Sequence, residues 1–91
     1  MRVAYGLVTS NILDVIEFSP DYSIVETVAL EDWEGKTLSE LNLGKHGLTI
    51  IAIKTGEHIN IVPSSDTIIN HGDIIVILGG VKNLRIISDL T

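Results

Sequence analysis

The sequence predicts an α+β domain in which a single mixed or antiparallel sheet of about five strands packs against a short helix and a C-terminal helix. Three observations lead to this class. The 91 residues suffice for one small domain. Apolar runs rich in isoleucine and valine recur along the chain, as in strands. Apolar residues at helical spacing and residues typical of helix caps occur only in short segments, which lie between the apolar runs or at the ends of the chain.

The first third of the chain predicts a helical segment followed by two strands. Residues 1–10 carry a short helical pattern and are interpreted as the end of a connecting helix. Strands are predicted over 12–19 and 23–30, and the Ser-Pro-Asp-Tyr sequence at 19–22 is typical of a turn. Residues 31–36 are expected to form a loop.

The middle of the chain predicts a short helix and a hairpin. Thr37 and Glu40 have the spacing of a capping box, which places a helix over 37–43. Two apolar runs, 48–54 and 58–63, are joined by a glycine-containing turn and are expected to pair as a β-hairpin.

The end of the chain predicts a loop over 64–73, the central strand and the last helix. Residues 74–80 are the most hydrophobic segment, ended by two glycines. Apolar residues spaced by three then indicate a helix over 81–90. Because several strands are apolar on both sides and 45% of the residues are hydrophobic, we expect a dimer rather than a well-buried monomer.

Composition disfavours several classes of function. The formal net charge is −6 and the six basic residues are scattered, so binding to nucleic acid is not expected. The absence of cysteine excludes thiol catalysis and thiolate metal sites. No apolar run approaches the ~20 residues of a membrane helix, so we expect no direct membrane insertion and a cytoplasmic location.

Catalytic and metal-binding patterns are weak, and the prediction is a protein that is not an enzyme and has no metal site. His46, His58 and His71 occur separately and outside any zinc motif. The acidic residues around Trp33 lack the spacing of a calcium loop, which favours a solvated loop over a cation site. Trp33 itself is interpreted as a packing anchor rather than a ligand platform.

Two glycine-containing segments could serve either as sites or as corners. In 78–84, the glycines could present backbone N–H groups to a phosphate, but a tight strand-to-helix turn is favoured. In 41–50, a helix end, Lys45 and an apolar strand start could form a shallow nucleotide pocket. The alternative is an ordinary corner with Gly47 in a left-handed conformation.

Four segments, in order and spacing, resemble the RCK C-terminal domain, also called the TrkA C-terminal domain. They are NILDVIEFSPDYSIVE, GKTLSELNL, GLTIIAIK and INIVPSSDTIINHGDIIVILGG. The resemblance covers about residues 10–88 and is nearest to Ktr-type regulatory subunits of bacterial potassium uptake systems.

This resemblance implies a regulatory domain over 11–91 that follows a nucleotide-binding domain lacking from these residues. It also implies homodimers, ring assembly in the full-length protein, and a membrane potassium transporter as partner, with a cytoplasmic location peripheral to the membrane. The alternatives are a structural dimerisation module without a ligand and an RCK-type domain of another cation transporter.

Several domains of this kind bind cyclic di-AMP at the dimer interface, which makes it the candidate ligand here; no intrinsic cofactor is expected. Carried over residue by residue, the resemblance implies a site of nine residues: Leu38, Leu41, Asn42, Leu43, Gly44, Lys45, Thr49, Ile50 and Pro63.

The chain departs from the family pattern within this site. Asn42 stands where the family has an acid, Gly44 where it has an arginine, and Thr49 where it has an asparagine. Lys45 could replace the phosphate-binding cation, but without the bidentate geometry of arginine. Loss of one charge-assisted hydrogen bond costs about 1.5–3 kcal/mol, so we expect weakened binding.

Overall fold

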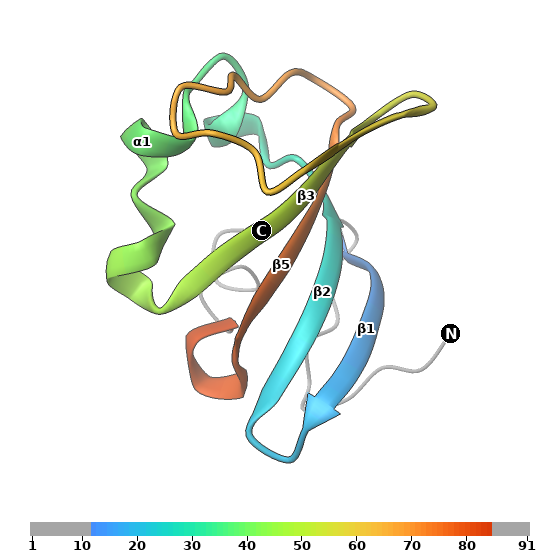
Figure 1. Ribbon diagram of the computed structural model, residues 1–91, viewed down its shortest axis with the longest axis vertical. Coiled ribbons are helices and arrows are strands. Elements are labelled where there is room, and N and C mark those ends of the chain that lie inside the picture. The colour runs from blue at the N-terminus through green and yellow to red at the C-terminus, as the bar shows by residue number, and fades with distance from the viewer. Residues whose placement is uncertain (1–11, 85–91) are drawn as a thin grey trace.

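A five-stranded antiparallel sheet is the frame of the domain in the computed structural model, which describes residues 12–84 (Figure 1). The strand order is β1-β2-β5-β3-β4. The strands are β1 (Ile12–Ser19), β2 (Tyr22–Val28), β3 (Leu48–Thr55), β4 (His58–Ile61) and β5 (Ile74–Gly80). The predicted α+β class is confirmed, and every strand pair is antiparallel.

The central strand is β5, as its continuous apolar sequence predicts. It pairs with β2 along its whole length and with β3 on its other side. Its side chains alternate between complete and partial burial: Ile75 and Ile77 are fully buried, whereas their neighbours are half-buried. Val25 on β2 lies opposite Ile77 and is also fully buried, so these side chains form the middle of the core.

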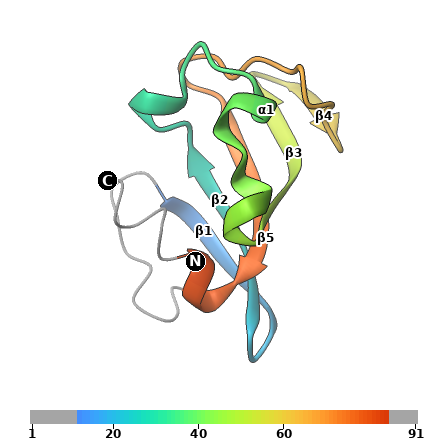
Figure 2. The ribbon, with the colours of Figure 1, turned by 90° about the vertical axis from the view of Figure 1, so that its left-hand side faces the viewer.

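Three short helical elements lie between β2 and β3 in the chain. They are the 3-10 turn η1 (Glu31–Trp33), the helix α1 (Leu38–Leu41) and the 3-10 turn η2 (Leu43–His46). Figures 1 and 2 show α1 close to β3 and distant from β1, the strand at the other edge of the sheet. Trp33 in η1 is only 3% exposed, which confirms it as a packing anchor.

The helix predicted over 37–43 is wrong in its second half. Asn42 adopts a left-handed conformation, with φ 47°, and ends α1 after one turn. Asparagine tolerates this conformation better than other non-glycine residues because its short polar side chain can bond locally. The chain then resumes as η2.

The other predicted boundaries need smaller corrections. The strand predicted over 58–63 ends at Ile61, where Val62 turns the chain with φ 49°. The second strand covers Tyr22–Val28, not 23–30. Of the predicted C-terminal helix, residues 81–84 are helical and the remainder lies outside the described residues, as does the helical segment predicted over 1–10.

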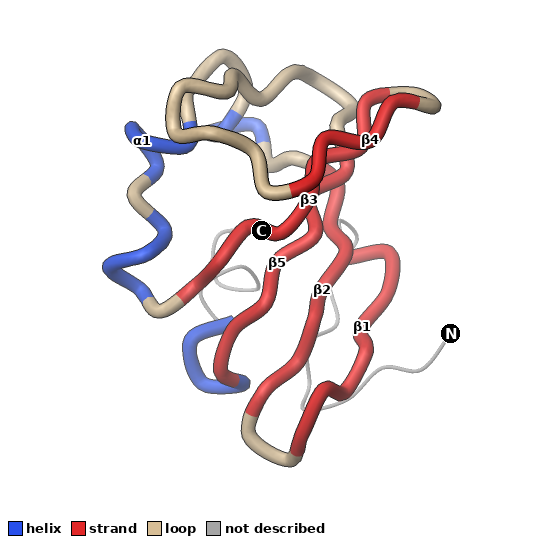
Figure 3. The backbone as a smooth tube through the Cα atoms, viewed as in Figure 1, coloured by secondary structure: helices blue, strands red, loops and turns tan. Residues whose placement is uncertain are grey.

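The long connection between β4 and β5 is held against the segment that leads into α1. Figure 3 shows this loop passing beside α1. Backbone N–H groups of Gly35, Leu38 and Ser39 donate to carbonyls of Ile69, Thr67 and Ser65, at 2.7, 3.1 and 2.9 Å. A loop distant in sequence therefore fixes the position of α1.

Asp73 organises the return of this loop into the sheet. Its side chain is 2% exposed and accepts hydrogen bonds from Thr55 Oγ1 and from the backbone N–H of Asn70, both at 2.9 Å. Its carbonyl accepts from the N–H of Ala29 at 2.8 Å. One residue therefore links the ends of β2, β3 and β5.

Replacing Asp73 by alanine should lower the free energy of unfolding by about 2–4 kcal/mol. The change leaves the Thr55 hydroxyl and the Asn70 N–H without their buried acceptor, and hydrogen bonds to charged groups are worth more than neutral ones. Urea denaturation followed by circular dichroism measures the loss. Asp32→Ala, on the exposed side of η1, is the control and should change stability little; equal effects of the two variants would contradict this role.

Candidate functional site

Helix α1 is a single turn that is stabilised by the predicted capping box. The Glu40 N–H donates to Thr37 Oγ1 at 3.1 Å, and the Thr37 N–H donates to Glu40 Oε1 at 3.0 Å. These reciprocal bonds satisfy donors that a helix start leaves unpaired. An isolated helix of this length would not be stable in water, so the capping box and the neighbouring loop hold it in place.

The turn from η2 into β3 requires a glycine. Gly47 has φ 75°, and its N–H donates to the Gly44 carbonyl at 3.0 Å. The left-handed backbone conformation disfavours any other residue here, and a Cβ at this position would lie 2.4 Å from Asn83 Nδ2, so the Asn83 side chain would also have to shift. The predicted left-handed Gly47 is confirmed.

These elements border an open hollow of about 490 Å³ beside the first half of β3. The start of β3 pairs with β5 on one side, but on its other side β4 pairs with β3 only from Ala52 onward. The hollow is lined by ten residues: Leu38, Ser39, Asn42, Leu43, Gly44, Leu48, Thr49, Ile50, Pro63 and Ser65. We call this space the α1–β3 pocket.

Seven of the nine residues predicted as a site line the α1–β3 pocket: Leu38, Asn42, Leu43, Gly44, Thr49, Ile50 and Pro63. Leu41 does not line it and packs against the buried core instead. Lys45 is exposed in η2 and is not part of the lining. The proposed replacement of a phosphate-binding arginine by Lys45 therefore finds no support in the pocket walls.

Three lining residues were missed by sequence reasoning. Ser39 and Leu48 lie next to predicted residues, so the helix and strand patterns could have indicated them. Ser65 comes from the long loop, and no local pattern points to it. Its carbonyl is brought to the pocket by the hydrogen bond from the Ser39 N–H.

The α1–β3 pocket has apolar walls and neutral polar groups. Leucine, isoleucine and proline side chains offer flat contact area, while Asn42 supplies an amide and Thr49 a hydroxyl. None of the lining residues carries a charge. Such a pocket suits a flat, mainly apolar group with hydrogen-bonding edges.

In the glycine-containing segment 78–84, the N–H that follows the two glycines, that of Val81, is already bonded within the protein. The Val81 N–H donates to the Asp21 carbonyl at 3.0 Å, which ties the end of β5 to the β1–β2 turn. The tight turn predicted at Gly79 and Gly80 is wrong, because both residues belong to β5, pair with Ser23 and Tyr22 and lack a left-handed φ.

The histidines and acidic residues do not converge. His71 Nδ1 lies 2.8 Å from Glu34 Oε2 on the surface, which joins two loops. Among residues 12–84, no three histidine or acidic side chains are grouped so as to hold a metal ion. In the same part of the chain, no helix has the length and hydropathy needed to span a bilayer.

Loss of the capping box should be visible both in stability and in one pKa. Hydrogen bonds from the Thr37 backbone and hydroxyl hold the pKa of Glu40 below its usual value of 4.5. Thr37→Ala removes the hydroxyl but retains the backbone N–H, so the pKa of Glu40 should rise only part of the way towards that value, and unfolding should become about 1 kcal/mol easier. NMR titration of the Glu40 carboxyl and thermal denaturation measure the two effects.

The sign of the pH dependence follows from the lowered pKa of Glu40. Its contribution to stability is present above pH 4.5 and is lost as the pH falls through the pKa in the folded state. Glu40→Gln retains a neutral acceptor and should remove this part of the pH dependence. A Glu40 pKa that is unchanged in Thr37→Ala would contradict the assignment.

Comparison with known families finds one match over most of the chain. A family model described as the TrkA-C domain matches residues 24–90. The match includes η1, α1, η2 and the last three strands, and therefore all residues of the α1–β3 pocket.

Two curated relatives come from Bacillus subtilis (strain 168). The chain is 36% identical over 84 residues to Ktr system potassium uptake protein C, and 36% identical over 86 residues to Ktr system potassium uptake protein A. These alignments cover 91% and 93% of this chain but only 38% and 39% of the relatives. The chain thus spans about two fifths of their length.

Solved structures share the fold. The RCK C domain of the potassium transport protein KtrA, in complex with cyclic di-AMP, is 31% identical, with a TM-score of 0.71 over 77% of this chain and 84% of that one. The GsuK RCK domain is 22% identical, with a TM-score of 0.75 over 88% of this chain and 18% of that one. The second likeness concerns the fold alone.

Proposed function

The chain belongs to the TrkA-C domain family, and from this we propose that it is the regulatory domain of a bacterial potassium uptake protein that binds cyclic di-AMP in the α1–β3 pocket. Two Ktr relatives and the cyclic di-AMP complex of a KtrA domain support the proposal. The domain would act in the cytoplasm by binding a ligand and a partner, not by catalysis.

The observation that carries this proposal is the agreement between the implied ligand residues and the α1–β3 pocket. Positions taken from the sequence resemblance lie on α1, η2, β3 and the chain after β4, yet seven of them surround one space. An adenine ring could pack against Leu43, Ile50 and Pro63. The Asn42 amide and the Thr49 hydroxyl are then available to its polar edge.

A symmetric ligand needs two such pockets. Cyclic di-AMP carries two adenines, whereas the α1–β3 pocket of about 490 Å³ lies in one chain. We therefore expect two copies to bind one ligand about a two-fold axis, each copy enclosing one base.

The edge of the sheet next to this pocket offers a surface for the second copy. Ile59, Ile61 and Val62 are 51%, 67% and 76% exposed, and Val62 directly precedes the pocket residue Pro63. Exposed apolar side chains on an edge strand invite association. Val62 is also a β-branched residue with positive φ, a strained conformation of a kind that occurs at functional sites.

Regulation would then consist of a change in the geometry of the dimer. A ligand bound between two copies stabilises the dimer arrangement for which it has the higher affinity. The equilibrium between two arrangements shifts by the difference between their binding free energies. In the full-length protein, the altered dimer would be relayed through a ring of subunits to a membrane potassium transporter.

Titration calorimetry with cyclic di-AMP tests the proposed ligand. The wild-type chain should bind it, and Gly44→Arg should bind it about 10- to 100-fold more tightly, as expected for one added charge-assisted hydrogen bond. Gly44 suits this change because a Cβ there meets no atom within 4 Å and its φ is not positive. Cyclic di-GMP, which offers a different base edge, should bind more weakly.

Glu57→Arg is the matched control, because it adds the same residue in the exposed β3–β4 turn, away from the α1–β3 pocket. It should leave the affinity within about threefold of wild type, since exposed charges interact weakly at physiological salt. Absence of heat and of a thermal shift with both wild type and Gly44→Arg would instead favour a dimerisation module without a ligand.

Light scattering after size exclusion tests the proposed dimer. Ile61→Asp places a charge on the β4 edge and should convert a dimer at micromolar concentration into a monomer, because burying an unpaired carboxylate is costly. Phe18→Asp, on the opposite edge strand and 68% exposed in the wild type, should leave the dimer intact. A wild-type monomer, or dissociation by Phe18→Asp alone, would contradict the location of this interface.

A further inference from the structure

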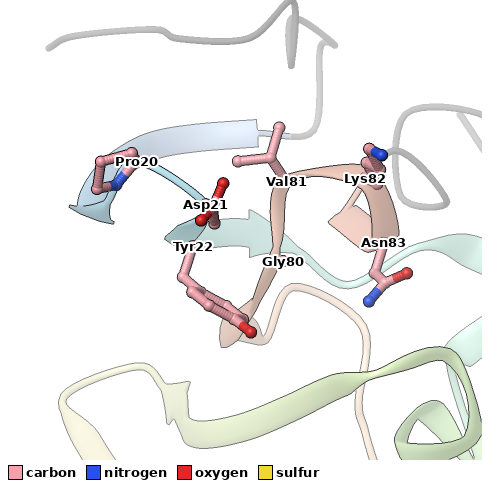
Figure 4. Close-up of a pocket in the computed structure, with 7 residues that line it drawn as sticks. All are labelled: Pro20, Asp21, Tyr22, Gly80, Val81, Lys82 and Asn83. Atoms are coloured by element: carbon pink, nitrogen blue, oxygen red, sulfur yellow. The ribbon is translucent and has the colours of Figure 1, made fainter.

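A second hollow lies at the C-terminal end of the β5 strand, on its β2 side, and is not used by the proposed cyclic di-AMP site. It has a volume of about 470 Å³ and lies between the β1–β2 turn and the residues that follow β5 (Figure 4). It is lined by seven residues: Pro20, Asp21, Tyr22, Gly80, Val81, Lys82 and Asn83. None of them lines the α1–β3 pocket.

Within this hollow, Gly80 forms the floor of a narrow slot. Gly80 pairs with Tyr22 across the sheet. A Cβ built on Gly80 would lie 3.8 Å from Tyr22 Cε1 and 3.6 Å from Asn83 Nδ2. Figure 4 shows the Tyr22 ring and the Asn83 amide extending on the same side of Gly80. The missing side chain therefore leaves a space between an aromatic ring and an amide.

The two walls of the slot have unused binding capacity. Tyr22 is 53% exposed, so much of its ring is open to contact. Within residues 12–84, neither the Tyr22 hydroxyl nor the Asn83 amide has a hydrogen-bond partner. An asparagine amide offers a donor and an acceptor side by side, and an aromatic ring offers a flat apolar surface.

The two charged residues at the edge of this hollow, Asp21 and Lys82, do not favour a ligand of either charge. Asp21 and Lys82 are both exposed, carry opposite charges and form no ion pair with each other. Their effects on a ligand in the slot oppose one another. The slot is therefore best matched by a neutral group that is flat and has a polar edge.

We propose that the Tyr22–Gly80–Asn83 slot binds a neutral heteroaromatic ring with a hydrogen-bond donor and an acceptor next to each other on its edge. The ring stacks on Tyr22, its edge pairs with the Asn83 amide, and the Gly80 backbone allows the close approach. The volume of the hollow lies within the ~300–1,000 Å³ range of small-molecule sites.

Uracil is a suitable probe, because its N3–H lies between two carbonyl oxygens, and 1,3-dimethyluracil is its matched control without the donor. In ¹H–¹⁵N NMR spectra, uracil should shift the Asn83 side-chain amide and the Gly80 N–H saturably, with a Kd of about 1–10 mM as befits so small a ligand. The dimethylated compound should bind about tenfold more weakly, since it keeps the carbonyl acceptors but has lost the N3–H donor.

Gly80→Ala is the decisive variant. Its methyl group would fill the slot at ordinary contact distances, and the backbone φ of Gly80 is compatible with alanine. The variant should therefore fold with an unchanged or higher Tm and lose uracil binding at least about tenfold. Tyr22→Leu should lose it similarly through the missing stack.

Cyclic di-AMP binding measured on the same samples separates this proposal from the proposed function. Gly80→Ala should leave the affinity for cyclic di-AMP at the wild-type value, whether or not uracil binds. The proposal is overturned if uracil causes no saturable shift at the Asn83 amide, or if folded Gly80→Ala and Tyr22→Leu bind uracil as the wild type does. Equal affinity for uracil and 1,3-dimethyluracil would also overturn it.

Discussion

The pairing of β5 with both β2 and β3 is the constraint on which the rest of the structure depends. It places the two glycines at the end of β5 against residues from distant parts of the chain. Gly79 lies so close to β3 that a Cβ would be 2.6 Å from Leu48 Cδ2, and Leu48 is a wall of the α1–β3 pocket. Gly80 is the floor of the second hollow. Two neighbouring residues of one strand thus shape both spaces.

The sequence is most informative where the determining interactions are local. The capping box at Thr37 and Glu40 needs only residues three apart, and it starts α1 as predicted. The apolar run of β5 likewise predicted the central strand. The early end of α1 was missed because no local pattern marks Asn42, which adopts a left-handed conformation immediately before the buried Leu43.

Seven of the nine positions inferred from the resemblance line one hollow, whereas the inferred cation, Lys45, does not. Positions on α1 and β3 could be transferred from a resemblance because the sheet and the capping box fix them. Lys45 could not be transferred in this way, because which residues of the 3-10 turn η2 line the pocket depends on how the turn packs, and the sequence does not reveal that packing. Ser65 and the Tyr22–Gly80–Asn83 slot depend on contacts between segments more than 20 residues apart, which no local pattern contains.

The absence of charged residues from the lining has a consequence for the strength and selectivity of binding. A pocket with neutral walls draws affinity from burial of the base and from neutral hydrogen bonds, each worth about 0.5–1.5 kcal/mol. A dinucleotide's phosphates would then face solvent or the second copy, and salt would affect binding little. Under the proposed function, each single pocket would contribute modestly, and most of the binding energy would come only when two copies hold the ligand together. Ligand occupancy would thereby be coupled to the arrangement of the proposed dimer, which is the property that a regulatory domain requires.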